Sequence, residues 1–256
     1  MDLTLPATGL VVGLLIGLTG IGGGAIMTPF LILVLGTRPV VAVGTDLVYG
    51  SVTKIAGAWL HWRQGTVDMR LSLRIAAASV PAGVLAVLAL QTFPPSTQAA
   101  DAAVRRGLGV VLILVALLMV ARLRGDMLLA VPDRWRRLLQ GPGTYVVGAI
   151  VGALVGFTSV GSGSLLVPFL VSVYPMTSAR IVGTDVFHAA LLVTATALAH
   201  AHGNAVNWPL AGSLLLGSVP GVMIGSWMAP KMSSRVLRAT LAVLLLLTGY
   251  QMLRAR

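Results

Sequence analysis

The sequence predicts an all-α polytopic membrane protein built from two homologous repeats. Of its 256 residues, 57% are hydrophobic and only 10% are charged, which is too little polar surface to cover a soluble globule of this size. Several apolar stretches reach the roughly 20 residues that a membrane-spanning helix requires, and the chain resembles itself at one constant offset. We therefore expect residues 1–256 to form a single domain embedded in a lipid bilayer.

The internal repeat is visible in matched glycine and polar positions. Residues 17–24 (GLTGIGGG) align with residues 156–163 (GFTSVGSG) at an offset of 139 residues. Without a gap, the same offset aligns Pro29 with Pro168, Gly44-Thr45-Asp46 with Gly183-Thr184-Asp185, His61 with His200, and Pro81 with Pro220. Chance similarity between apolar stretches would not place Gly, Pro, Asp and His in register, so the sequence predicts a duplication.

Each repeat is predicted to contain one glycine-interrupted segment followed by three uninterrupted helices. We expect the first repeat at about residues 5–123, a connecting loop at about 124–142 and the second repeat at about 143–256. The interrupted segments are expected at about 8–35 and 145–173, and the uninterrupted helices at about 40–61, 71–91, 104–122, 179–200, 209–229 and 234–254.

The interruptions are the most informative elements. A glycine costs roughly 1 kcal/mol relative to alanine inside a helix, so residues 20–24 (GIGGG), followed by Pro29, predict a helix that breaks within the membrane. Non-helical backbone at that depth requires protein or a water-filled cavity around it. Matched breaks in two halves of a chain indicate the binding site of a transporter.

Two topologies remain open, because each interrupted segment either crosses the bilayer or turns back as a re-entrant segment. Crossing gives four spans per half and parallel halves, whereas turning back gives three spans per half and inverted halves. We favour inversion, because it places most basic residues on one side with the central loop, although Arg254 and Arg256 then lie on the other side. The basic residues placed with the loop are Arg63, Arg70, Arg74, Arg180, Lys231, Arg235 and Arg238.

The net charge of +11 comes from basic residues that stand singly or in short groups between apolar runs. This distribution is typical of loops between membrane helices rather than of a nucleic-acid-binding face. We therefore expect no nucleic acid as a partner and a cytoplasmic location for the central loop, 124–142. The largest basic group lies at this loop and comprises Arg122, Arg124, Arg134, Arg136 and Arg137.

Patterns that would indicate an enzyme or a metal centre are absent from the sequence. The chain has no Cys and lacks the H-E-x-x-H, G-x-S-x-G, P-loop and dinucleotide-binding motifs. His61, His200 and His202 lie at predicted helix ends without the further ligands that a metal ion needs. We expect no enzymatic activity, no cofactor and no metal.

Asp46 and Asp185 are the only acidic residues predicted to lie inside membrane segments, and they occupy equivalent repeat positions. A carboxylate in the hydrocarbon region costs at least about 2.5–3.5 kcal/mol, so both residues are functional candidates. Three interpretations are open: helix capping by the Gly-Thr-Asp sequence, binding of a solute or ion, and proton relay.

Three further residues are candidates for a coupling or charge role. Tyr49 and His188 follow Asp46 and Asp185 by three residues, on roughly the same helix face, and an Asp185–His188 pair could pass protons near neutral pH. Lys54 is the only Lys inside a predicted span, and it either attracts an anion or extends to the membrane interface.

The glycine-rich breaks have the chemistry of an anion site. A helix that restarts at Gly24 or Gly163 directs unpaired N–H groups and the positive end of its dipole into the break. Small residues there also permit close helix packing, so packing and binding are both open. The candidate substrate-binding residues are Thr19, Gly22, Gly23, Gly24, Thr45, Asp46, Thr158, Ser159, Gly161, Ser162, Gly163, Thr184 and Asp185.

The order of these motifs resembles the sulfite exporter TauE/SafE family. The resemblance rests on residues 20–24 and 159–163, each followed by Pro and then Gly-Thr-Asp, and on residues 202–208 (HGNAVNW) and 220–225 (PGVMIG). It extends over essentially the whole chain. It implies a plasma-membrane permease for small sulfur-containing oxyanions such as sulfite and organosulfonates.

We therefore expect a multi-pass secondary transporter of a small anion in the plasma membrane, with the lipid bilayer as its surroundings. The two halves would alternate access by rocking against each other, and proton coupling is left open. A passive channel or facilitator is the main alternative, and a membrane-embedded enzyme is less favoured. The oligomeric state is open, a homodimer included.

Overall fold

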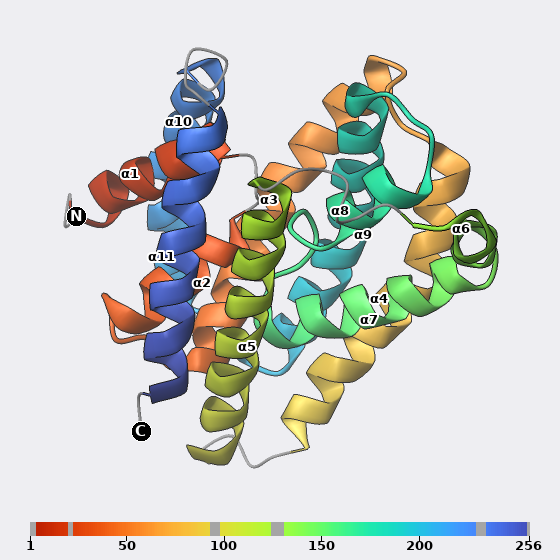
Figure 1. The fold of residues 1–256 in the computed structure, drawn as a ribbon. Coiled ribbons are helices and arrows are strands. Elements are labelled where there is room, and N and C mark those ends of the chain that lie inside the picture. The colour runs from red at the N-terminus through yellow and green to blue at the C-terminus, as the bar shows by residue number, and fades with distance from the viewer. Residues whose placement is uncertain (1–3, 20–22, 93–97, 124–130, 229–233, 255–256) are drawn as a thin grey trace.

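The structure, a computed structural model, describes residues 4–19, 23–92, 98–123, 131–228 and 234–254. Within these ranges the regular structure is entirely helical, which confirms the predicted all-α class (Figure 1). The helices are α1 (Thr4–Thr19), α2 (Gly24–Leu33), α3 (Pro39–Arg63), α4 (Met69–Gln91), α5 (Gln98–Leu123), α6 (Asp133–Gln140), α7 (Gly143–Thr158), α8 (Leu166–Val173), α9 (Ser178–His202), α10 (Trp208–Met228) and α11 (Ser234–Arg254).

Several of these helices have the length and composition of membrane spans. Among the described residues, four pass both criteria: α4, α5 over Gln98–Ala121, α9, and α10 over Trp208–Gly225. A fifth is added if α6 and α7, which are bent by 68° at their junction, count as one span. The chain is therefore a multi-pass membrane protein by the apolar length of its helices.

The segment containing α7 and α8 is a helical hairpin. The Thr144 hydroxyl, in the first turn of α7, lies 2.7 Å from the Tyr174 hydroxyl, just after α8. The Gln140 amide, just before α7, donates to the Val173 carbonyl over 2.7 Å. The chain thus enters and leaves this segment at the same place, and residues 159–165 turn it around.

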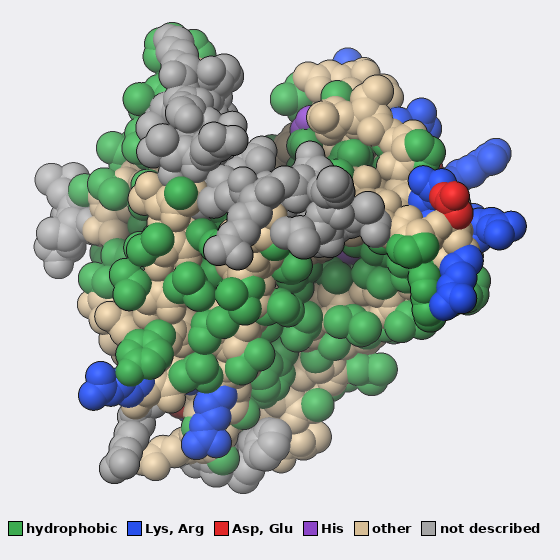
Figure 2. Space-filling model, viewed as in Figure 1, with side chains coloured by type: hydrophobic (Ala, Val, Ile, Leu, Met, Phe, Trp, Pro, Cys, Tyr) green, Lys and Arg blue, Asp and Glu red, His purple; other side chains and the backbone are tan. Residues whose placement is uncertain are grey.

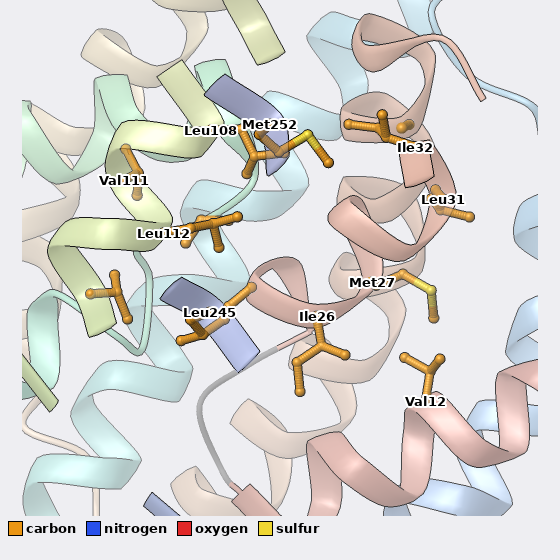
Figure 3. Close-up of a cluster of buried hydrophobic side chains, with 14 of the residues drawn as sticks. Val12, Ile26, Met27, Leu31, Ile32, Leu108, Val111, Leu112, Leu245 and Met252 are labelled. Carbon is orange, nitrogen blue, oxygen red and sulfur yellow. The ribbon is translucent and has the colours of Figure 1, made fainter. Parts of the chain in front are cut away.

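The segment containing α1 and α2 is arranged in the same way. Thr8 and Val11, early in α1, line one groove together with Leu33 and Val34 at the end of α2. A cluster of buried hydrophobic side chains joins both helices to α5 and α11, with Val12 and Met27 facing the side chains of the latter pair (Figure 3). The first hairpin is therefore fixed against the bundle by apolar packing.

Each hairpin packs along a helix of the opposite half of the chain, α1 along α10 and α7 along α4. The backbones touch: a Cβ atom at Gly13 would lie 2.4 Å from the Ser218 carbonyl oxygen, and one at Gly152 would lie 2.0 Å from that of Ser79. Glycine is required at both positions, because any side chain would force the helices apart.

The loops after α3 and α9 make matched hydrogen bonds across the molecule. The Thr45 hydroxyl accepts from the Asn207 N–H over 3.0 Å, and the Thr184 hydroxyl accepts from the Asp68 N–H over 2.9 Å. Asn207 follows Asp68 by 139 residues, as Thr184 follows Thr45. The long helices α3 and α9 are thereby tied together at both ends, which places Asp46 and Asp185 in the interior.

One predicted helix start is wrong. Helix α2 begins at Gly24 as expected, but α8 begins at Leu166, three residues after Gly163. The left-handed backbone of Ser159 (φ 63°) and the positive φ of Gly161 (132°) belong to a longer turn between α7 and α8. These conformations are incompatible with a right-handed helix.

Candidate functional site

Asp46 lies where the two hairpins meet. Its Oδ2 atom accepts a 2.7 Å hydrogen bond from the Thr28 hydroxyl, on α2 of the first hairpin. The same atom accepts a 2.6 Å bond from the Ser159 hydroxyl, at the tip of the second hairpin. Asp46 is 2% exposed, so one buried carboxylate oxygen connects both broken segments.

The second carboxylate oxygen of Asp46 is unused. Oδ1 is buried and has no hydrogen-bond partner among the described residues. The Tyr49 hydroxyl, one helical turn further along α3, is also buried; Ser218 lies near it, without a hydrogen bond of normal geometry. Gly23 lies against both, since a Cβ atom there would be 3.2 Å from the Tyr49 ring and 3.7 Å from Oδ1. Two unsatisfied polar atoms thus face the break before α2.

The tips of the hairpins touch at Gly24. A Cβ atom at Gly24 would lie 2.1 Å from the Ser159 carbonyl oxygen, so only glycine permits this approach. Ser159 holds a left-handed backbone (φ 63°) that non-glycine residues rarely adopt. Its N–H donates to the Val155 carbonyl over 2.7 Å, which ends α7. This backbone strain holds the Ser159 hydroxyl in place on Asp46.

The N-cap interpretation of the two aspartates is wrong. Helix α3 begins at Pro39 and α9 at Ser178, so both carboxylates lie two turns inside a helix. The N-cap of α9 is Thr177, whose side chain accepts from the Arg180 N–H. The carboxylates are therefore interior groups without a capping role.

Asp185 has a different environment from Asp46. It is 3% exposed, and its Oδ1 atom has no hydrogen-bond partner among the described residues. The repeat position of Thr28 is occupied by Val167, so that hydroxyl donor is missing. His188 bonds through Nε2 to the Ser79 hydroxyl over 2.7 Å, and its buried Nδ1 atom is without a partner in the described part of the chain.

Lys54 faces this second acidic position rather than the first. Gly50 contacts Val193 and Gly57 contacts Val186, so α3 and α9 run antiparallel, and residue 54 lies level with the turn that contains Asp185 and His188. The charge of Lys54 acts on both of these side chains. It forms no ion pair within 4 Å among the residues that the structure describes.

The other predicted site residues divide into three groups. Thr45 and Thr184 brace loops, as described above, and Thr158 donates to the Leu154 carbonyl within its own helix. Gly161 and Gly163 form the turn after α7, where Ser162 is buried. Gly22 and the side chain of Thr19 lie outside the described residues.

Sequence reasoning missed Thr28. Its side chain is fully buried and donates to Asp46, yet it stands in an apolar stretch and has an apolar partner, Val167, in the repeat. That mismatch is the one signal that could have identified it, because a polar residue gained at one of two matched positions requires its own partner.

A cavity of about 380 Å³ lies where α3 begins and α9 ends. Its polar lining includes Arg38, Gln91, His200 and Asn204. Arg38 is paired with Asp101 over 2.9 Å, and His200 donates through Nε2 to the Gly156 carbonyl over 3.0 Å. The cavity therefore offers a polar approach toward the region of Asp46 from one end of the bundle.

Comparisons with known proteins identify one family. The family model described as "Sulfite exporter TauE/SafE" matches residues 5–252. "Probable membrane transporter protein YjnA" of Bacillus subtilis (strain 168) is 43% identical over 256 residues, which cover 99% of this chain and 100% of that protein.

More distant relatives carry the same kind of name. A "Probable membrane transporter protein" of Xylella fastidiosa (strain Temecula1 / ATCC 700964) is 28% identical over 90% of this chain and 85% of its own. "Probable membrane transporter protein YunE" of Bacillus subtilis (strain 168) is 24% identical over 97% of this chain and 96% of its own. No solved structure matches the chain.

Proposed function

Because the chain belongs to the sulfite exporter TauE/SafE family, we propose that it is a secondary transporter of a small anion. The preferred substrate class is a sulfur-containing oxyanion such as sulfite or an organosulfonate. The observation that carries this proposal is the Asp46 carboxylate, which connects the tips of both hairpins and keeps one buried oxygen free.

In the proposed topology the two halves are duplicated units inserted in opposite orientations. Helices α3, α4, α5, α9, α10 and α11 cross the bilayer, and the two hairpins are re-entrant. The adjoining ends of α7 and α8 support this arrangement. Arg63, Arg70, Arg74 and Arg180 share one end with α6, so we assign that end to the cytoplasmic face of the plasma membrane.

The substrate site in this proposal lies at the break before α2, beside Gly23 and Gly24. The first N–H groups of α2 and its positive dipole end suit an oxyanion. An ionised Asp46 would repel the anion, and a buried carboxylate without a cation is itself costly. A proton on Oδ1 removes both problems, because a neutral carboxyl group donates a hydrogen bond. Anion and proton would therefore bind together.

Alternating access then follows from the contacts at Asp46. In the structure the site is closed, since Asp46 and Tyr49 are each 2% exposed. Separating the hairpin tips breaks the Ser159 bond while the Thr28 bond keeps Asp46 on the first hairpin. The cavity at Arg38 and His200 provides the route to the end opposite α6.

The test is uptake into proteoliposomes that contain the purified protein. Sulfite, sulfate, thiosulfate, sulfoacetate and a simple carboxylate would be compared with and without a pH gradient. We expect saturable uptake of one or more sulfur oxyanions that a proton gradient accelerates. Flux that never saturates and ignores the gradient would instead identify a passive facilitator.

A further inference from the structure

The basic helix α6 stands apart from the transport site and presents an unusual surface. None of its eight residues is buried. Trp135 and Leu138 are 48% and 49% exposed, and their spacing of three places them on one helix face. Arg134 and Arg137 form the adjacent stripe by the same spacing. A short helix thus exposes an apolar stripe beside a row of positive charge.

Helix α6 is held at a fixed angle to the bundle. It bends by 68° from α7, and the Thr144 hydroxyl of α7 donates to the Leu139 carbonyl over 2.7 Å. Arg74 of α4 donates to the Gln140 carbonyl over 3.3 Å. Lys and Arg side chains gather at the edge of the molecule where α6 lies (Figure 2). The helix is therefore an ordered part of a basic edge.

The charges on α6 are only partly compensated. Asp133 pairs with Arg136, and the Arg134 guanidinium lies over the Trp135 ring at 5.1 Å. Arg137 has no acidic partner among the described residues. A groove of about 440 Å³ runs between α6 and Pro175, lined by Arg136, Arg137, Gln140 and Asp133. Its basic and amide groups suit a phosphate group.

We propose that α6 lies in the membrane interface and binds the headgroup of an anionic phospholipid. Trp135 and Leu138 enter the boundary between headgroups and acyl chains, where aromatic side chains are favoured. Arg136 and Arg137 hold the phosphate in the groove, and Arg134 adds charge. A lipid fits better than a soluble anion, because only a lipid engages the apolar stripe and the basic stripe together.

The experiment is a lipid titration of the full-length protein in detergent, followed by native mass spectrometry. Phosphatidylglycerol and phosphatidylcholine are compared on the wild type, on Arg134→Gln/Arg137→Gln, and on a control with the same charge change, Arg106→Gln/Arg254→Gln. The four arginines are exposed. The control pair lies at the opposite end of the bundle. A melting curve of each variant verifies folding.

We expect the wild type to retain phosphatidylglycerol in preference to phosphatidylcholine. The α6 variant should weaken that binding on the order of tenfold, from the loss of two basic residues, while the control stays near the wild type. Equal retention of both lipids, or equal losses in both variants, would overturn the proposal. Displacement of the lipid by millimolar inorganic phosphate would show a free-anion site instead.

Discussion

The Ser159 hydroxyl donates a 2.6 Å hydrogen bond to Asp46 across 113 residues of chain. Ser159 ends α7 with a left-handed backbone, whereas Asp46 lies in the interior of α3. This bond is the polar contact by which the second hairpin reaches the acid that the first hairpin also binds. Its removal should therefore affect the closed state more than the fold of either hairpin.

Substitutions of Ser159 separate backbone strain from hydrogen bonding. Ser159→Ala removes the donor and keeps the left-handed strain, so we expect a loss of about 1–3 kcal/mol. Ser159→Gly also removes the donor but relieves strain, and it should be more stable than the Ala variant by roughly 1 kcal/mol. Melting in detergent compares the two. An Ala variant at least as stable as the Gly variant would contradict the strained geometry.

Asp46→Asn distinguishes a functional carboxylate from a structural one. The Asn side-chain oxygen can still accept from Thr28 and Ser159, and its amide group mimics a permanently protonated acid. We expect a folded protein whose stability changes by less than about 1 kcal/mol. Transport in proteoliposomes should lose its response to a pH gradient. Asp185→Asn is the matched control, and unchanged coupling in Asp46→Asn would refute proton binding at this residue.

Part of this site was predictable from the sequence. Asp46 and Asp185 could be identified because charged residues are rare in apolar helices, and the glycine-rich breaks because glycine disfavours helices. The hydrogen bond from Ser159 to Asp46 could not, since nothing in the sequence states which element of the other half a hairpin tip will contact. Thr28 was missed for the same reason. The start of α8 was misplaced because turn length depends on local φ angles such as that of Gly161.

Gly24→Ala tests the contact between the hairpin tips. The added methyl group would lie 2.1 Å from a backbone oxygen that cannot move independently. We expect a loss of about 1–3 kcal/mol and little transport. Gly212→Ala is the control, because no atom lies within 4 Å of a Cβ atom there. Similar melting temperatures for the two variants would mean that the tips separate freely.

Lys54 and Asp185 should be energetically coupled through the contact of α3 with α9. Lys54→Met removes the nearby positive charge and makes the buried carboxylate more costly. Adding Asp185→Asn should restore part of the lost stability, with an interaction energy of about 0.5–3 kcal/mol in the double-mutant cycle. The cycle is read from thermal melting of the four proteins. Strict additivity would show that Lys54 extends to the interface and does not compensate Asp185.

The inverted topology can be tested by single-cysteine labelling, because the natural chain contains no Cys. Gln64 and His202 are both exposed and lie at the ends of α3 and α9. If the halves are inverted, a membrane-impermeant maleimide added to intact cells should label His202→Cys and leave Gln64→Cys unlabelled until the membrane is opened. Parallel halves would place both positions on one side, so that the two variants would label alike. The same experiment assigns the α6 end, because Gln64 follows α3 at the end where Arg180 pairs with Asp68.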